Sequence, residues 1–348
     1  MRRVRWQIAA LAVVTALMAG CGGGSSGSDS GSGPTTVTMG TIRGSSADAA
    51  VFVAIDKGFF RDEGVNVDLR PFNSGAQFVA PLGAGQLDAG SGGISAGLFN
   101  AVANDVGVKL AAAKSIAGTP SYTSLLVRKS LVDSGRYKDF SDLKGMKVAI
   151  PALGTAPHTE LGLFVKKAGL TMKDVKLEEL GFADMVPALK NGSVDAAVAI
   201  EPSATLAVRS GGAVKVAGSD EVFPGEQSAA IMFGDRFIKD DPETAQKVMD
   251  GYLRGARYYR SALKGTRLYG ARGKEVAGIL AKYTKASPKL LLSIPLHTIT
   301  PNAALDVPKI QREVDFWRSQ GLIKSDIKAQ DAIDTQFVDQ AVKDLAGQ

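Results

Sequence analysis

The sequence predicts an α/β protein with two similar lobes and a helical C-terminal region. The chain has 348 residues, more than the roughly 250 that one hydrophobic core usually serves. From residue 37 onward, segments with strand and helix patterns alternate, as they do in α/β proteins. The pattern L-x-x-G-x-[LV]-D-A occurs at residues 82–89 and again at 189–196, within longer stretches that resemble each other. We therefore expect two related lobes in series.

The N-terminus has the features of an export signal followed by a tether. Three arginines precede an apolar run over residues 8–18, which predicts a secretory signal peptide over residues 1–20. Cys21 follows in a context similar to the bacterial lipobox, so we expect it to carry lipid and to anchor the chain on the extracytoplasmic face of the cell membrane. An exported chain with a free cysteine is the alternative. Residues 21–36 are rich in Gly and Ser, which predicts a flexible tether.

Composition excludes several functions. The formal net charge is +6, but three of the arginines belong to the predicted signal peptide, so the basic balance supports export and no nucleic-acid partner. A single cysteine excludes an intramolecular disulfide, a Cys-rich zinc site and an iron–sulfur cluster, and two histidines leave little for metal chemistry. We expect neither a metal nor a cofactor.

The expected elements follow in order along the chain. In the first repeat they are a strand at 37–40, a helix over 48–57, a strand over 65–69 and a helix that opens at 74–77. In the second repeat they are a strand at 147–150, a turn at 153–156 and a helix through Lys167. Beyond residue 235 they are helices that begin near 241–243 and that cover 307–320 and 329–345.

Four segments resemble one protein family. They are V-A-I-D-K-G-F-F at 53–60, G-Q-L-D-A-G at 85–90, D-L-K-G-M-K-V-A at 142–149, and N-G-S-V-D-A-A at 191–197 with Glu201-Pro202 after it. In this order they resemble the solute-binding proteins of bacterial ABC importers, in the nitrate, taurine and alkanesulfonate group that includes NMT1/THI5-like proteins. The resemblance covers roughly residues 37–260.

The resemblance implies a two-lobed type II periplasmic-binding-protein fold that binds solute in an interlobe cleft. Lobe 1 would comprise residues 37–124 and 228–348, and lobe 2 residues 125–227, with the C-terminal helices packed mainly on lobe 1. It also implies a monomer without enzymatic activity that delivers its solute to an ABC permease and its ATPase subunit. The chain has no Walker A motif of its own.

Helix N-termini would converge on such a cleft, where free N–H groups and the helix dipole favour anions. The candidate loops are 42–47, 91–95, 153–158, 182–185 and 200–203. The candidate ligand-binding residues on them are Arg43, Ser45, Ser46, Ser91, Ser95, Thr155, His158, Asp184 and Glu201. We expect a small solute that is an anion of the sulfonate, nitrate or carboxylate type, or a flat heterocycle. Three aromatic residues could stack on a flat ligand, namely Tyr122, Phe182 and Phe223.

Each candidate also has a structural interpretation. Arg43 could be a solvated surface residue, the hydroxyl residues could cap helices, and His158 could be structural. Glu201 could meet a ligand cation or Arg43, or could interact with a helix N-terminus. Asp88 and Asp195 could be paired carboxylates for acid–base chemistry, but their equivalence in the repeat favours turns or strand entry.

Residues 93–97 form a literal G-x-S-x-G, the nucleophile-elbow pattern of α/β hydrolases. A secreted serine hydrolase that uses Ser95 is therefore the alternative function. The small residues at 90–92 do not resemble the bulky strand that an elbow needs, and the histidine could only be His158 or His297. A solute sensor without a permease partner is a third possibility. The pyrimidine-synthesising activity of some relatives depends on a cysteine-rich motif that this chain lacks.

Overall fold

The computed structural model describes residues 33–346. The predicted signal peptide, Cys21 and most of the predicted tether lie outside the described residues. Among the helices of this described part, none combines the length and the apolar character that crossing a membrane requires.

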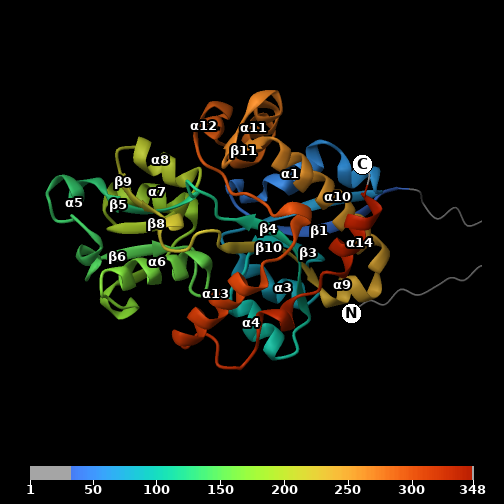
Figure 1. Cartoon of the computed structure of the whole chain (residues 1–348), viewed down its shortest axis with the longest axis horizontal. Helices are drawn as coiled ribbons and strands as arrows, with labels where there is room; N and C mark the ends of the chain where they lie inside the picture. The colour runs from blue at the N-terminus through green and yellow to red at the C-terminus, as the bar shows by residue number, and fades with distance from the viewer. Residues whose placement is uncertain (1–32, 347–348) are drawn as a thin grey trace, which may run out of the picture. The chain divides into compact units, whose positions relative to one another are not determined.

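The first sheet has five strands in the order β2-β1-β3-β10-β4 (Figure 1). These strands are β1 (Thr35–Ile42), β2 (Val65–Phe72), β3 (Ala89–Gly93), β4 (Val108–Ile116) and β10 (Gln227–Gly234). β1 runs parallel to β2 and β3, whereas β10 runs antiparallel to β3 and β4. We call this sheet, with the helices on it, lobe 1.

The second sheet repeats this arrangement in the order β7-β6-β8-β5-β9. Its strands are β5 (Thr123–Arg128), β6 (Lys147–Ile150), β7 (Lys176–Glu179), β8 (Ala196–Ile200) and β9 (Ala213–Gly218). β6 is parallel to β7 and β8, and β5 is antiparallel to β8 and β9. We call this sheet, with its helices, lobe 2. The fourth strand in each order is thus antiparallel to its neighbours, and the predicted two-lobed α/β fold is confirmed.

Asp88 and Asp195 occupy equivalent places in the two sheets. Asp88 Oδ2 accepts from the Thr38 backbone N–H of β1 at 2.7 Å, and Asp195 Oδ2 accepts from the Lys147 N–H of β6 at 3.0 Å. Asp195 also pairs with Arg128 at 2.7 Å. Each aspartate therefore stands directly before a strand, β3 or β8, and bonds the backbone of the neighbouring strand, which is the structural role at strand entry that the repeat predicts.

Helices cover both sheets (Figure 1). On lobe 1 they are α1 (Ala49–Asp56), α2 (Phe59–Asp62), α3 (Val79–Gly83) and α4 (Ala96–Ala103). On lobe 2 they are α5 (Lys129–Asp133), α6 (Ala156–Lys167), α7 (Phe182–Asn191) and α8 (Ser203–Arg209). The C-terminal helices are α9 (Asp235–Asp240), α10 (Pro242–Ser261), α11 (Gly270–Thr284), α12 (Pro288–Ser293), α13 (Val307–Ser319) and α14 (Gln336–Asp344), with a short hairpin of β11 (Leu263–Lys264) and β12 (Arg267–Leu268).

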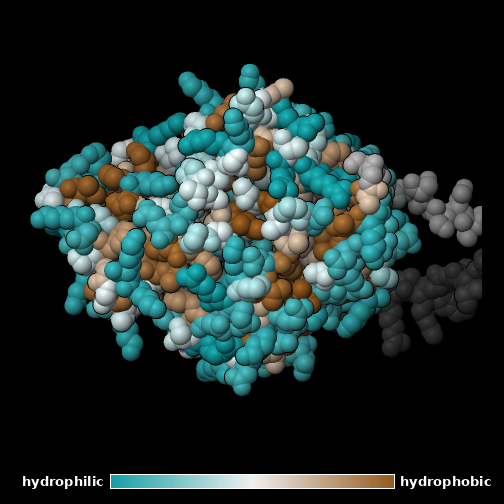
Figure 2. Space-filling view, in the orientation of Figure 1, coloured by the Kyte–Doolittle hydropathy of each residue, from teal (hydrophilic) through white to brown (hydrophobic). Residues whose placement is uncertain are grey.

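The long helix α10 packs on lobe 1 against α1, α2 and α14. Its buried stripe includes Val248, Met249 and Tyr252, spaced as the amphipathic pattern predicts. The molecular face drawn in Figure 2 is mostly hydrophilic, and hydrophobic residues show in small groups on it. The apolar faces of these helices are thus largely turned inward.

The helix α13 contacts both lobes. Ile310, Val314 and Trp317 are fully buried in a cluster with lobe 1 residues. Phe316 points the other way and lies against Gly162 of α6, where a Cβ atom would come within 2.3 Å of the ring. Glycine at position 162 therefore lets the aromatic ring of α13 reach the backbone of lobe 2.

The predicted helix over residues 329–345 is wrong at its start. Residues Ala329–Ala332 form a 3₁₀ turn, and the α-helix begins only at Gln336. Ile333 pairs with Leu110 of β4 in an isolated bridge, and the Asp334 N–H donates to the Leu110 carbonyl. A residue held extended against a strand cannot continue a helix, and a tertiary contact of this kind is invisible to local periodicity.

Candidate ligand-binding site

A cavity of about 60 Å³ lies between the two lobes. Lobe 1 lines it with Ile42, Ser45, Ala47, Ser74, Gly75, Gly93, Lys114, Ser228 and Ala229. Two segments join the lobes: the first crossing segment is residues 117–122, between β4 and β5, and the second is residues 219–226, between β9 and β10. The first crossing segment and lobe 2 line the cavity with Tyr122, Thr123, Pro151, Thr155, Ala156, Pro157, Glu160, Phe182 and Ile200. A space of this size exceeds what a single water needs, which is on the order of 10–15 Å³.

Apolar side chains from both lobes pack together at one wall of this cavity. Ala47 of lobe 1, Tyr122 of the crossing segment and Ile200 of lobe 2 form a small buried cluster, and Phe182 packs against it. Phe182 opens α7 and Tyr122 precedes β5, so two aromatic rings border the space. Such rings offer flat apolar surfaces for stacking.

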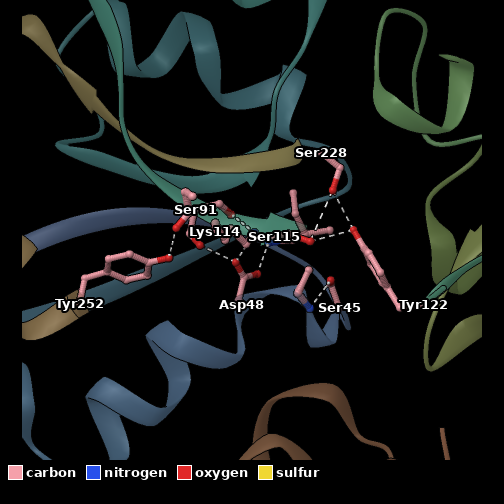
Figure 3. A network of polar contacts seen from close by, with 11 residues as sticks. Ser45, Asp48, Ser91, Lys114, Ser115, Tyr122, Ser228 and Tyr252 are labelled. Atoms are coloured by element: carbon pink, nitrogen blue, oxygen red, sulfur yellow. Dashed lines mark hydrogen bonds and ion pairs between the residues drawn. The ribbon is translucent and has the colours of Figure 1, made fainter. Parts of the chain in front are cut away.

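A buried ion pair forms the lobe 1 side of the cavity (Figure 3). Lys114 Nζ lies 2.5 Å from Asp48 Oδ1 and donates to the Ser91 carbonyl at 2.9 Å. Asp48 also accepts from Ser91 Oγ at 2.6 Å and from the Ile42 N–H at 3.0 Å. Both charged side chains are almost fully buried, with exposed fractions of 1% and 0%.

The fold explains why these two charges meet. Asp48 is the last residue of a 3₁₀ turn (Ser46–Asp48) before α1, where the helix dipole stabilises a carboxylate. Lys114 stands near the end of the buried strand β4. Burial lowers the pKa of Lys114, and the charge and hydrogen bond of Asp48 oppose that effect.

Tyr122 connects the first crossing segment to lobe 1 (Figure 3). Its hydroxyl accepts from Ser115 Oγ of β4 and pairs with Ser228 Oγ of β10, both at 3.0 Å. Burial raises the pKa of Tyr122 to about 12, so it is a neutral hydrogen-bonding group at physiological pH. The ring position is thus set by two strands at once.

Three buried glutamates meet on the other side of the cavity. Glu160 comes from α6 and lines the cavity, Glu226 ends the second crossing segment, and Glu313 comes from α13. Burial raises the pKa of Glu160 to about 7. Burial, with the charges of Glu160 and Glu313, raises the pKa of Glu226 well above its usual range, and burial also raises the pKa of Glu313.

The hydrogen bonding of this acid cluster, Glu160, Glu226 and Glu313, is incomplete. Among residues 33–346, no donor pairs with Oε2 of Glu160, with either carboxylate oxygen of Glu226, or with Oε1 of Glu313. Thr159 Oγ1 donates to the other oxygen of Glu313. Because three carboxylates so close together repel one another, they hold protons at pH values where isolated acids are ionised.

Two of the predicted ligand-binding residues line the cavity. Ser45 Oγ accepts from the Ala47 N–H at 2.9 Å and so caps the 3₁₀ turn before α1. Thr155 stands at the N-cap of α6, but its hydroxyl donates to the Ala152 carbonyl at 2.7 Å. Both hydroxyl groups border the space while they also stabilise their own loops.

Three other predicted residues join the lobes around the cavity. Ser46 Oγ donates to the Glu201 carbonyl at 2.9 Å across the lobe boundary. Ser95 forms an isolated β-bridge with Thr155, and the next N–H, of Ala96, donates to the Gly154 carbonyl at 2.8 Å. The Glu201 carboxylate accepts from Thr205 instead of meeting Arg43, and burial raises its pKa.

The remaining predicted residues lie away from the cavity. Arg43 and Asp184 are exposed, and Ser91 lies behind the cavity in the Asp48 network. His158 is buried beside the Phe316 ring, its Nδ1 accepts from the Gly154 N–H at 3.3 Å, and burial lowers its pKa to about 4. Phe223 is buried under Arg312 and does not line the space.

Ser95 has the geometry of a helix cap. Its Oγ accepts from the Leu98 N–H at 3.3 Å, the side chain is fully buried, and its φ of −148° is extended. A nucleophile elbow instead presents a strained, exposed hydroxyl to a histidine. His158 is bonded to Gly154, and His297 is fully buried against Tyr259. The G-x-S-x-G pattern is thus explained by helix capping.

Sequence reasoning missed the charged residues of the cavity, Lys114 and Glu160. Lys114 follows three alanines in a predicted apolar strand, and a lone charge in such a run is a signal of a buried, paired residue. Glu160 lies on a helix that is buried over most of its length, as only the tertiary structure reveals.

Two equivalent sheets, two crossing segments and a cavity between the lobes are the features of the type II periplasmic-binding-protein fold. The chain belongs to the NMT1-like family, whose model matches residues 30–267. A Brucella abortus protein named as a binding protein is 28% identical over 212 residues. That match covers 60% of this chain and 62% of the relative, so it spans less than two thirds of the relative's length.

Solved structures share the fold over most of the chain. The alkanesulfonate-binding protein SsuA from Xanthomonas axonopodis pv. citri, bound to MOPS, has a TM-score of 0.69 at 19% identity and covers 87% of this chain and 99% of its own. The ligand-binding component of an ABC-type import system from Staphylococcus aureus has a TM-score of 0.72 at 14% identity, with coverages of 88% and 99%.

Enzymes also share this fold. The desulfurization enzyme DszB has a TM-score of 0.64 at 15% identity and covers 89% of this chain and 99% of its own. A 4-amino-5-hydroxymethyl-2-methylpyrimidine phosphate synthase from Aspergillus parasiticus is 26% identical over 153 residues, which are 44% of this chain and 42% of the enzyme. The fold by itself therefore serves both binding and catalysis.

Proposed function

We propose that this protein is an extracytoplasmic solute-binding protein of an ABC importer, without enzymatic activity. The observation that carries the proposal is the cavity, which receives side chains from both lobes. Separation of the lobes would widen such a space for ligand entry, and bound ligand would then stabilise the closed arrangement. The S. aureus import component and SsuA, which share this fold, support the assignment.

The contacts across the lobe boundary supply the closed state that a permease would recognise. The Ser46–Glu201 hydrogen bond and the Ser95–Thr155 bridge form only when the lobes meet. A permease and its ATPase subunit would read this arrangement, and Cys21 would keep the receptor at the membrane through its lipid. The solute would be of the small anionic or flat heterocyclic type.

A ligand panel on a cavity-filling variant tests the proposal. Gly93 lines the cavity, and a Cβ placed on it would meet only the Ser228 carbonyl, at 3.8 Å. Gly93→Leu should therefore fold and fill the space. A thermal shift should appear with at least one of nitrate, taurine, alkanesulfonates, aromatic carboxylates, pyrimidines and benzamidine; it should rise with the concentration of that ligand in the wild type and disappear in Gly93→Leu.

Gly278→Leu on α11 is the matched control, since a Cβ placed on Gly278 would meet nothing within 4 Å and the residue does not line the cavity. It should keep the ligand response of the wild type. No stabilisation by any member of the panel, or equal stabilisation of Gly93→Leu, would contradict the proposed function.

The membrane anchor is tested separately. Cys21→Ser should release the protein from the membrane fraction of the expressing cell.

A further inference from the structure

The charges that border the cavity do not suit an anion. Among the cavity residues in the described part of the chain, Lys114 is the only base and Glu160 is the only carboxylic acid. The Lys114 ammonium already contacts Asp48 and the Ser91 carbonyl, so its charge is neutralised within lobe 1. Arg43, the other base expected to meet the ligand, is exposed and does not line the space.

The helix N-termini near the cavity offer few donors to an anion. At the start of α6, Pro157 has no N–H, and the His158 and Thr159 N–H groups both donate to the Thr155 carbonyl. At the start of α4, the Ala96 N–H donates across the lobe boundary and the Leu98 N–H donates to Ser95. At these two helix starts an anion would therefore find no row of free amides, and the cavity base Lys114 is already paired, which leaves single hydroxyl groups such as that of Ser74 as donors.

Glu160, by contrast, has one carboxylate oxygen that no donor of the described residues reaches, although the Thr123 and Ser219 hydroxyl groups lie close enough to the carboxyl to oppose the rise of its pKa on burial. Its side chain is 1% exposed, it lines the cavity, and no donor among residues 33–346 pairs with Oε2. Behind it lie two further buried carboxyl groups, Glu226 and Glu313; burial raises the pKa of Glu313, and the charge of the neighbouring base Arg312 opposes that effect. A buried carboxyl group with an unpaired oxygen is stabilised when a ligand supplies a hydrogen-bond donor, and a cationic donor stabilises it most.

We propose that the cavity binds a flat solute with a cationic amidine-type or amine-type donor group, which donates to Glu160 while its apolar part lies against Phe182 and Tyr122. This inference rests on the proposed function and assigns the solute class for the same cavity. The cation replaces a proton of the acid cluster, and that proton passes to solvent. The ligand thus differs in charge from the alkanesulfonates that give SsuA its name.

Three probes of nearly equal shape test the inference: benzamidinium, benzamide and benzoate, a cation, a neutral amide and an anion. Calorimetric titration of the wild type should give an affinity for benzamidinium at least roughly tenfold above that for benzoate, since hydrogen bonds to charged groups are the stronger ones. Glu160→Gln should remove this preference. Glu178→Gln, an exposed glutamate of β7 in lobe 2, should leave it unchanged.

The wild-type series alone decides the matter if Glu160→Gln does not fold. Equal or tighter binding of benzoate, binding of none of the three probes, or a cation preference that persists in a folded Glu160→Gln protein would overturn the inference. Taurine and nitrate are titrated in parallel: their binding with silence of benzamidinium would leave the receptor function intact and reject only the cationic solute.

Discussion

The two sides of the cavity bury charge in opposite ways. In lobe 1, Lys114 and Asp48 form a pair whose oxygens and ammonium are nearly all engaged. On the other side, Glu160 lies beside Glu226 and Glu313, with the Thr123 and Ser219 hydroxyl groups close by, and several carboxylate oxygens of the cluster have no donor among the described residues. The first arrangement is a completed structural contact. The second is incomplete in the protein alone, as expected of a site that a ligand completes.

The largest expected effect comes from breaking the complete pair. Asp48→Ala leaves the Lys114 ammonium buried without its partner, which should lower the free energy of unfolding by about 3–5 kcal/mol. Urea denaturation near neutral pH measures this loss. The control is Asp133→Ala, which breaks an exposed pair with Lys129 and should cost less than about 1 kcal/mol. Similar decreases in the free energy of unfolding in both variants would mean that the buried ion pair contributes no more to stability than the exposed one.

The acid cluster should make stability fall as pH rises. The folded pKa of Glu160 is raised to about 7 from a usual value of 4.5, so the folded chain binds more protons than the unfolded chain between these values. This contribution is fully present below the unfolded pKa and is lost as pH rises through the folded pKa. For one carboxyl group with this shift, the free energy of unfolding should fall by an amount on the order of 3 kcal/mol.

Thermal and urea unfolding between about pH 5 and about pH 8 would measure this slope. Glu160→Gln should reduce the loss, because it removes one titrating carboxyl, and the exposed Glu178→Gln should not. An equal pH dependence of stability in the wild type and in Glu160→Gln would contradict the description of the cluster as proton-sharing. The comparison of the two proteins is decisive, because the lowered pKa of His158 by itself makes stability rise with pH below about 6.5 in both.

The smallest expected effect concerns the helix starts that meet at the lobe boundary. Ser95 caps α4 through the Leu98 N–H, whereas Thr155 does not cap α6. Ser95→Ala should therefore lower the free energy of unfolding by about 1 kcal/mol, and it should leave any background hydrolysis of generic esters unchanged. The exposed Ser193→Ala serves as control. Loss of a robust wild-type esterase activity in Ser95→Ala would restore the hydrolase alternative.

The sequence predicted those features of the fold that depend on a repeated pattern or on residues close together in the chain. The repeated L-x-x-G-x-[LV]-D-A pattern predicted two equivalent sheets, and the equivalence of Asp88 and Asp195 predicted their structural roles. The helix predicted over residues 307–320 is confirmed as α13, which ends one residue earlier. These features depend on residues close together in the chain, where periodicity and capping preferences apply.

The charged residues that line the cavity could not be predicted from sequence patterns. Glu160, Glu226 and Glu313 come from three separate parts of the chain, and Lys114 meets Asp48 only through the sheet. The residue types alone favoured Arg43 and Asp184, both of which are exposed. Periodicity does not determine the orientation of side chains on loops, so it could not separate these residues from those that line the cavity.

The placement of α13 has a mechanical consequence. Two bodies joined by two crossing segments can rotate about the line through those segments. This helix is fixed to lobe 1 by Trp317 and its neighbours, and its Phe316 rests on Gly162 of lobe 2, which gives a third point of attachment. Rotation of lobe 2 must therefore slide or separate the Phe316 contact. The C-terminal region, besides being part of lobe 1, thus opposes the separation of the two lobes.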